Sequence, residues 1–178
     1  MRKTADIVFL LALSATSAAR AETVTATLTF TDGSGAPAPI ANATVEIWRF
    51  RPRGWFWTWG NDLTTSTDAR GRLSATMPFA GNGVIYGLRV FATNPAAVVY
   101  TQDLYTQPFY RQPGLPGTEI LRTTSSPSDV HDFTFEFADA WATNHFNAAD
   151  AVLRGFNYAS ARRDPRETDT IAQLAVLA

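Results

Sequence analysis

A tryptophan-rich segment contains the residue types in this sequence that are best suited to bind a ligand. Four of the five tryptophans, counting Trp48, fall within twelve consecutive positions. Alternate side chains of an extended strand point to the same face, so three indoles at every second position form a flat row on which sugar rings can stack. An amide and a carboxylate follow, and both can bind sugar hydroxyls. The residues of this candidate carbohydrate site are Trp55, Trp57, Trp59, Asn61 and Asp62.

The same segment has two other interpretations. Large aromatic side chains bury much apolar surface, which favours a hairpin that packs on its own sheet or on a C-terminal helix. The remaining interpretation is a surface that binds a protein partner. Arg49, Arg51 and Arg53 alternate along the segment. We interpret them as a solvated strand face or as cations stacked on the indoles, rather than as an anion site.

Catalytic and metal-binding motifs are absent from the sequence. It has no cysteine, two histidines, no H-E-x-x-H pair and no G-x-S-x-G turn. We interpret His131 as a solvated loop residue and His145 as a packed or capping residue near the start of a helix. The run Gly81-Asn82-Gly83 leads into a strand and not into a helix, so it does not fit a phosphate-binding loop. The sequence therefore predicts no catalytic residue, no metal site and no cofactor.

Length and composition are those of one ordinary globular domain. The chain has 178 residues, of which 46% are hydrophobic and 17% are charged. The apolar content excludes a disordered acidic tail, and the lack of cysteine excludes a disulfide framework. A formal net charge of −1 gives no basic surface for a phosphate backbone. Nucleic acid is therefore not expected as a partner.

The first 21 residues have the layout of a secretory signal peptide. Arg2 and Lys3 precede an apolar run over 7–13, and the segment ends in small residues up to Ala21. The apolar run is far shorter than the about 20 residues that span a bilayer. We therefore expect cleavage near Ala21/Glu22. The mature protein is expected to be secreted or periplasmic, bacterial in origin and without a transmembrane segment.

The middle of the chain shows the two-residue period of β-strands. Apolar residues from Val24 to Phe30 alternate with threonines, and short β-rich runs recur as far as Phe137. The runs at 64–67 and 73–77 flank Asp68-Ala69-Arg70-Gly71, which predicts a tight hairpin. Such a series of short strands without a long helix predicts a mainly β fold, an antiparallel Ig-like β-sandwich.

Three stretches within residues 23–100 carry a recognisable pattern. They are residues 35–47, the run from Thr67 to Leu73, and Tyr86-Gly87-Leu88-Arg89-Val90. With their Gly-x-Pro turn, T-D-x-x-G turn and Y-x-L-x-V strand they resemble the carboxypeptidase regulatory-like family. The resemblance implies a transthyretin-like topology and an accessory role without an active site. The tryptophan-rich insertion and the polar stretch 102–129 depart from the family pattern.

The last forty residues change to a helical period. The pattern predicts an amphipathic α-helix over 143–162, with Thr143 or Asn144 as its N-cap and a buried stripe that includes Trp141 and Phe146. Gly155 in its middle predicts a close packing partner, because glycine otherwise weakens a helix. The chain then ends in the apolar run 171–178. Residues 138–158 are similar to the opening of a second, often protease-like domain that follows such sandwiches in secreted bacterial proteins.

The sequence thus predicts a signal peptide over 1–21, a β-sandwich over 22–137 and a C-terminal helical segment over 138–178. The first functional hypothesis is a secreted, non-catalytic interaction or accessory module that binds a protein or cell-surface partner. The first alternative is a carbohydrate-binding module that uses the tryptophan-rich hairpin on a polysaccharide. The second alternative is the N-terminal fragment of a secreted peptidase-like protein, in which 138–178 begins a truncated second domain.

Overall fold

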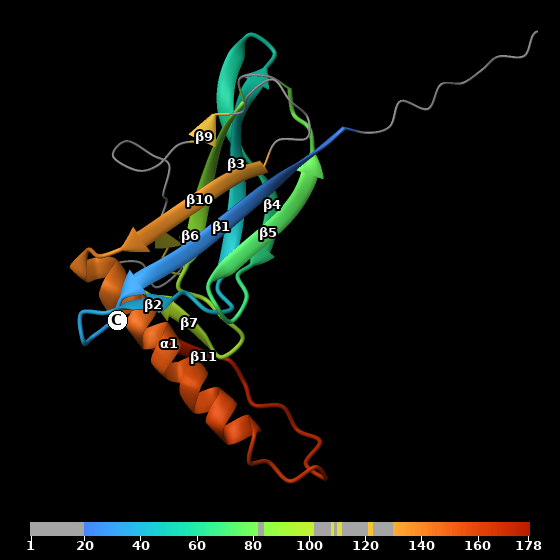
Figure 1. Cartoon of the computed structure of the whole chain (residues 1–178). Helices are drawn as coiled ribbons and strands as arrows, with labels where there is room; N and C mark the ends of the chain where they lie inside the picture. The colour runs from blue at the N-terminus through green and yellow to red at the C-terminus, as the bar shows by residue number, and fades with distance from the viewer. Residues whose placement is uncertain (1–19, 82–83, 102–107, 109, 112–120, 123–129) are drawn as a thin grey trace, which may run out of the picture.

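The computed structural model describes residues 20–81, 84–101, 108, 110–111, 121–122 and 130–178. Most of the predicted signal peptide and most of the polar stretch 102–129 lie outside the described residues, and the signal peptide stays a prediction. Ala21, at the predicted cleavage site, begins the first strand. Figure 1 shows a two-layer β-sandwich with one long helix at one end.

Within these described residues, eleven strands and one helix follow one another in chain order, and the helix precedes the last strand. Their bounds are β1 Ala21–Thr31, β2 Pro37–Pro39, β3 Thr44–Arg53, β4 Phe56–Ser66, β5 Arg72–Pro78, β6 Ile85–Phe91, β7 Ala97–Tyr100, β8 Tyr110–Arg111, β9 Leu121–Arg122, β10 Val130–Phe137, α1 Ala140–Ser160 and β11 Leu174–Leu177. The mainly β fold with a C-terminal helix is confirmed.

Two sheets form the sandwich. In the first sheet β1 is central, with β10 on one side and with β5 and β2 on the other. In the second sheet β3 lies between β4 and β6, and β6 also pairs with β8 and β9. Most pairs are antiparallel, but β10 runs parallel to β1, and β11 runs parallel to β7.

The alternation in β1 explains how the two layers meet. Val24, Ala26, Leu28 and Phe30 are buried, while the intervening threonines lie on the other face. Residues of the second sheet, such as Ile47 and Leu88, complete the same core. The two-residue period therefore predicted correctly which side of this strand faces the interior.

The predicted hairpin around Asp68-Ala69-Arg70-Gly71 is wrong. The turn is present, because Asp68 Oδ1 accepts hydrogen bonds from the backbone N of Arg70 at 2.7 Å and of Arg72 at 2.8 Å. The strands that it joins belong to different sheets, since β4 pairs with β3 and β5 pairs with β1. The turn therefore carries the chain from one layer of the sandwich to the other. Turn residues indicate a reversal of the chain but do not fix which strands pair.

Gly71 is required where this turn meets β1. Its φ is +71°, and a Cβ at this position would lie 2.3 Å from the carbonyl oxygen of Leu28. We expect Gly71→Ala to lower the free energy of unfolding by at least about 2 kcal/mol, because left-handed backbone strain adds to a backbone clash. Urea unfolding measures the loss. Gly33→Ala is the control, since nothing lies within 4 Å of that position, and an equal loss in both variants would contradict the argument.

The helix begins earlier than the sequence pattern predicts. Its N-cap is Asp139, whose carboxylate accepts a hydrogen bond from Ala142 N at 3.0 Å, so the prediction of Thr143 or Asn144 is wrong. Trp141 lies in the first turn and is 56% exposed rather than buried. The expected close partner of Gly155 is also wrong, because nothing lies within 4 Å of a Cβ built there. The buried stripe consists of Ala142, His145, Phe146, Ala149 and Leu153, and it leaves Trp141 and Gly155 on the exposed side of the helix.

The helix packs on the core of the sandwich at the end where β1 and β10 finish. The ring of Phe146 lies 6.0 Å from that of Phe30 and 5.3 Å from that of Phe137. The buried Asn94 side chain donates to Ala149 O in the helix at 3.0 Å, and its backbone oxygen accepts from Gln173 Nε2 at 2.6 Å. The helix and the segment before β11 are therefore joined to the same core.

The C-terminal strand lies at the rim of the molecule. β11 pairs with β7 from Leu174↔Ala97 to Leu177↔Tyr100. Leu174 is 54% and Leu177 50% exposed. Within the described residues, no helix is long and apolar enough to cross a membrane.

Candidate functional site

The β3–β4 hairpin extends beyond the sheet that carries it. β3 and β4 pair from Thr44↔Ser66 to Arg53↔Phe56, whereas β6 accompanies β3 only as far as Phe50. The part of the hairpin beyond Phe50 therefore pairs only with itself among the described residues. In Figure 1 its end lies at the opposite end of the molecule from α1.

Two aromatic side chains are exposed at the end of this hairpin. Gly54, with a φ of +66°, and Trp55 form the turn. Trp55 is 97% exposed, and Phe56, the first residue of β4, is 55% exposed. We call Trp55 and Phe56 the aromatic tip. Adjacent exposed apolar side chains can form a patch, and such patches mark interaction sites more often than single exposed residues do.

The structure does not place the residues of the predicted carbohydrate site in one row. Trp55 lies in the turn and not in a strand. Trp59 is half-buried, and its ring packs at 5.4 Å on the ring of Phe50. The side chain of Trp57 lies outside the described residues. Asn61 is exposed, and its amide donates to Thr64 Oγ1 at 3.2 Å.

Asp62 points into the protein because of a bulge. Ile47 pairs with Leu63 and Trp48 with Asn61, so Asp62 is the extra residue between them. Its side chain is 8% exposed and accepts a hydrogen bond from Arg49 Nε. A β-bulge redirects side chains in this way. Asp62 is therefore bound to Arg49 rather than presented beside the indoles.

The base of the hairpin rests on a group of buried polar residues from both sheets. We call this group the charge cluster. The carboxylate of Glu22, whose side chain is fully buried, accepts hydrogen bonds from Arg49 Nη1 at 3.1 Å and from the Tyr86 hydroxyl. Arg49 Nη1 also donates to Pro78 O at 2.8 Å. The members of the charge cluster are Glu22, Arg49, Asp62, Tyr86 and His131.

His131 belongs to the charge cluster, and its interpretation as a solvated loop residue is wrong. It lies in β10 with a side chain that is 6% exposed. Its ring stacks on that of Tyr86 at 5.0 Å, and its Nε2 lies 3.5 Å from Glu22 Oε2. His145 is packed, as expected, with Nδ1 2.6 Å from Trp141 O.

Burial and hydrogen bonding shift two pKa values in the charge cluster. For Arg49, burial is the largest single effect and lowers the pKa, but the hydrogen bonds and charge interactions with Asp62 and Tyr86 together outweigh it, so the net pKa is raised. Burial and the hydrogen bond to Glu22 raise the pKa of Tyr86. Arg49 therefore stays a cation and Tyr86 a neutral donor. The cluster joins β1, β3, β4, β6 and β10 at the base of the hairpin.

The charge cluster contains metal-ligating residue types but does not have the arrangement of a metal centre. Among the described residues, no three His, Cys, Asp or Glu side chains are grouped so that they can hold a metal ion. The guanidinium of Arg49 also occupies the position between the two carboxylates. We therefore interpret the cluster as a buried network of ion pairs and hydrogen bonds that connects the strands.

A simple sequence signal was available for the charge cluster. Glu22 is in phase with the buried Val24, Arg49 with Ile47, and His131 with Phe133. Each charged residue thus occupies a strand position that faces the core. Polar residues in the inward phase of neighbouring strands predict a buried network, whereas the direction of Asp62 depended on a bulge that the sequence pattern does not reveal.

Comparison with known proteins assigns the chain to no family. No family model and no curated protein matches the chain. The solved structures that resemble it include a 9R-lipoxygenase from Cyanothece PCC8801, with a TM-score of 0.37 and 20% identity over 76% of this chain and 18% of the lipoxygenase. An (S)-allantoin synthase has a TM-score of 0.32 and 13% identity over 65% of this chain and 41% of the synthase.

A third solved structure is the dioxygenase domain of a dioxygenase–carbohydrate-binding protein fusion from Streptomyces sp. SirexAA-E. It has a TM-score of 0.31 and 12% identity over 71% of this chain and 86% of that domain. The chain spans less than half of the lipoxygenase and of the synthase. The class of protein is defined by the described structure itself, which is a β-sandwich with a C-terminal helix.

Proposed function

We propose that this chain is an exported, non-catalytic interaction module that binds a protein partner through the aromatic tip. The observation that carries the proposal is the 97% exposure of Trp55 at the end of a hairpin that extends beyond its sheet. Tryptophan is enriched among the residues that contribute most to binding in protein interfaces, where such residues fill pockets near the centre.

The base of the hairpin supports this role. Phe50 and Trp59 pack on each other across the two strands, and Asp62 binds Arg49 inside the sandwich. These contacts hold the two strands in one register, so the aromatic tip is presented in a defined orientation. A preorganised binding surface loses less conformational freedom when its partner binds.

The geometry favours a protein pocket over a sugar platform at this place. A stacking platform needs indoles side by side on one face, whereas Trp55 lies in the turn next to Phe56. The carboxylate of Asp62 is bound to Arg49 and is not available to sugar hydroxyls. Two exposed aromatic side chains at the end of a narrow hairpin fit an apolar pocket better than a flat sugar chain.

We propose a non-catalytic role for two reasons, the burial of both histidines and the family resemblance. His131 stacks on Tyr86 and His145 packs on Trp141, so neither is presented at an open surface. The resemblance to the carboxypeptidase regulatory-like family also implies an accessory role. Export follows from the signal-peptide pattern of the first 21 residues.

Affinity capture from envelope extracts of the native host tests the proposal. The immobilised mature protein is expected to retain a discrete partner that the double variant Trp55→Ala, Phe56→Ala loses. Tyr158→Ala is the matched control, because it removes an aromatic side chain that is 61% exposed on α1 and far from the aromatic tip. Equal retention by all three proteins would contradict the proposed role of the tip.

A further inference from the structure

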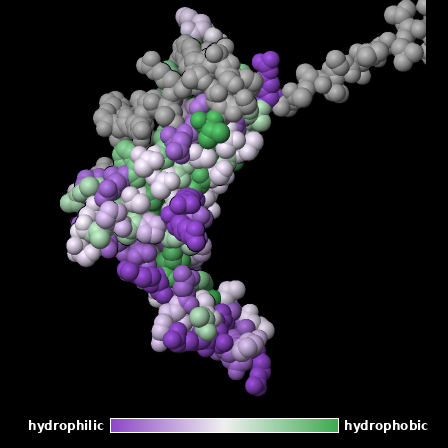
Figure 2. Space-filling view, in the orientation of Figure 1, coloured by the Kyte–Doolittle hydropathy of each residue, from purple (hydrophilic) through white to green (hydrophobic). Residues whose placement is uncertain are grey.

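The outer face of the first sheet is lined with hydroxyl groups. Thr23, Thr25, Thr27, Thr29 and Thr31 share the outward face of β1, because the buried residues of that strand occupy the alternate positions. Ser74 and Thr76 lie beside them on β5, and Asp132 and Thr134 lie beside them on β10. Figure 1 shows these three strands in front of the second sheet, and Figure 2 shows mainly white and purple residues on this face.

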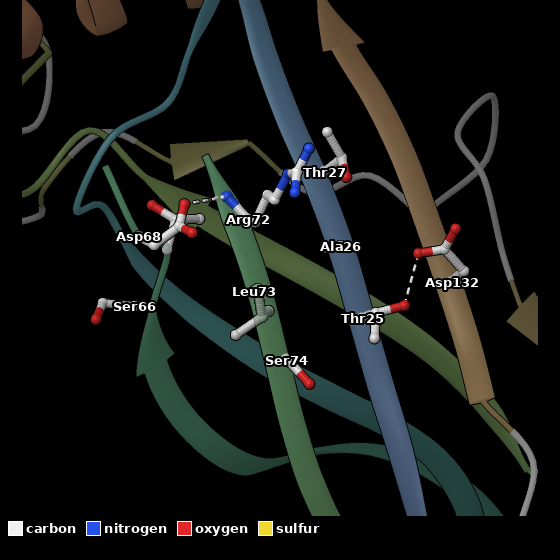
Figure 3. A pocket seen from close by; sticks show the side chains of 10 residues that line it. Thr25, Ala26, Thr27, Ser66, Asp68, Arg72, Leu73, Ser74 and Asp132 are labelled. Carbon is white, nitrogen blue, oxygen red and sulfur yellow. Dashed lines mark hydrogen bonds between the residues drawn. The ribbon is translucent and has the colours of Figure 1, made fainter. Parts of the chain in front are cut away.

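A groove of about 600 Å³ crosses this face near the Asp68 turn. Its floor is formed by β1 and β5, and its ends by β10 and by the segment after β4. Figure 3 shows hydroxyl, carboxylate and guanidinium groups around the groove. We call it the threonine groove; the polar side chains of its lining that the argument uses are Thr25, Thr27, Asp68, Arg72, Ser74 and Asp132.

The carboxylates at the two ends of the groove are held in place. Asp132 Oδ1 accepts a hydrogen bond from Thr25 Oγ1 at 2.6 Å, as Figure 3 shows. Asp68 Oδ1 accepts from the backbone N of Arg70 and of Arg72. Gly71 holds this turn against β1, since its carbonyl accepts from Leu28 N at 2.9 Å. Within the described part of the chain, the second oxygen of each carboxylate accepts no hydrogen bond and can accept one from a ligand.

Several donors in the groove make no hydrogen bond among the described residues. The hydroxyls of Thr27 and Ser74 and the guanidinium of Arg72 make no hydrogen bond there to other described side chains or backbone groups. Between the fixed carboxylates there are thus groups that can both donate and accept. This mixture of hydroxyls, carboxylates and one guanidinium suits a ligand that has many hydroxyl groups.

The charge and the strand order decide between classes of ligand. Two carboxylates face the guanidinium of Arg72, and Arg70 also acts on Asp68, so the groove has no excess of positive charge. This disfavours nucleic acid and acidic polysaccharides. β1 is paired on both sides over the groove, so a peptide cannot add to it as a strand. Among the described residues β5 and β10 are the edges of this sheet, and a peptide that paired there would lie beside the groove and not in it. A neutral glycan remains, because its hydroxyls can pair with every group in the groove.

We propose that the threonine groove binds a neutral polysaccharide chain, at a site separate from the aromatic tip. Asp132 and Asp68 accept from sugar hydroxyls at the two ends of the groove, and Thr27, Ser74 and Arg72 bind the sugar between them. The proposal does not depend on the aromatic tip, because the two sites lie on different elements. The proposed carbohydrate site therefore lies on the outer face of the first sheet, and not on the tryptophan-rich hairpin where the sequence predicted it.

Affinity gel electrophoresis tests this proposal with four soluble neutral polysaccharides: hydroxyethylcellulose, laminarin, arabinoxylan and galactomannan. At least one is expected to retard the wild-type protein. Asp132→Asn and the double variant Thr27→Val, Ser74→Ala are each expected to weaken that binding about tenfold, because each removes hydrogen bonds to the sugar. Thermal unfolding of each variant checks that it is folded.

Two controls separate the groove from other surfaces. Thr76→Val changes a hydroxyl on the same face of β5 outside the groove, and it is expected to keep wild-type binding. Trp55→Ala is expected to do the same. The proposal is overturned if none of the four polysaccharides retards the protein, or if binding is lost in Trp55→Ala and kept in the groove variants. The second result would show that the polysaccharide binds to the hairpin.

Discussion

Arg49→Met is expected to lower the free energy of unfolding by about 3–5 kcal/mol, because it leaves two buried carboxylates without their cation. The side chains of Glu22 and Asp62 are 0% and 8% exposed, and both bind the guanidinium. Methionine keeps the apolar volume of the arginine side chain, so the decrease in the free energy of unfolding is due mainly to the lost charge. Urea unfolding followed by circular dichroism measures the difference between the two proteins.

Two further variants show whether unpaired charge is the cause. Arg154→Met removes an arginine that is 73% exposed and pairs with Asp150 on α1, and it is expected to cost less than about 0.5 kcal/mol. The triple variant Arg49→Met, Glu22→Gln, Asp62→Asn is expected to recover part of the loss, because it removes the uncompensated charges. If the triple variant is less stable than Arg49→Met, the stability lost in Arg49→Met is due to broken hydrogen bonds rather than to unpaired charge.

Phe146→Ala is expected to cost about 3–5 kcal/mol, the usual range for deleting a fully buried phenylalanine. Its side chain is 2% exposed and packs between Phe30 and Phe137 at the helix end of the sandwich. The substitution removes the contacts of α1 with Phe30 and Phe137 and leaves a cavity between the helix and the core of the sandwich. Thermal or urea unfolding measures the loss, and a change below about 1 kcal/mol would mean that the helix is not docked in solution.

Gly155→Ala on the same helix is expected to change stability in the opposite direction. Nothing lies within 4 Å of a Cβ built at this position, so alanine fits without displacing a neighbour. Alanine is the better helix former by about 1 kcal/mol, and Gly155→Ala should therefore raise the free energy of unfolding by up to that amount. A loss of stability would show that the helix packs differently around this position.

Local periodicity was sufficient to predict the layers of this fold. The alternation of Val24 to Phe30 with threonines fixed the buried face of β1, and the alternation of Phe133 to Phe137 did the same for β10. Pairing was not predictable in this way, because it depends on contacts between distant segments. The Asp68 turn was therefore mistaken for a hairpin, and the parallel pairing of β1 with β10 was not foreseen.

The candidate sites show the same division. The exposure of Trp55 depends on a turn at Gly54 that interrupts the alternation of the tryptophan-rich segment. The inward direction of Asp62 depends on a bulge. The threonine groove needed the side-by-side placement of β10, β1 and β5, and only the threonine alternation in β1 was visible in the sequence. The sequence thus showed which residue types were available, but it did not show which side chains from different strands lie next to one another.

Site-specific photocrosslinking tests the proposed interaction most directly. A photoreactive phenylalanine analogue replaces Trp55 in one protein and Tyr158 in a second, and each is irradiated in the envelope of the native host. The proposal predicts a discrete protein adduct from position 55 and none of that size from position 158. No adduct at position 55, or the same adducts from both positions, would contradict a partner that binds the aromatic tip.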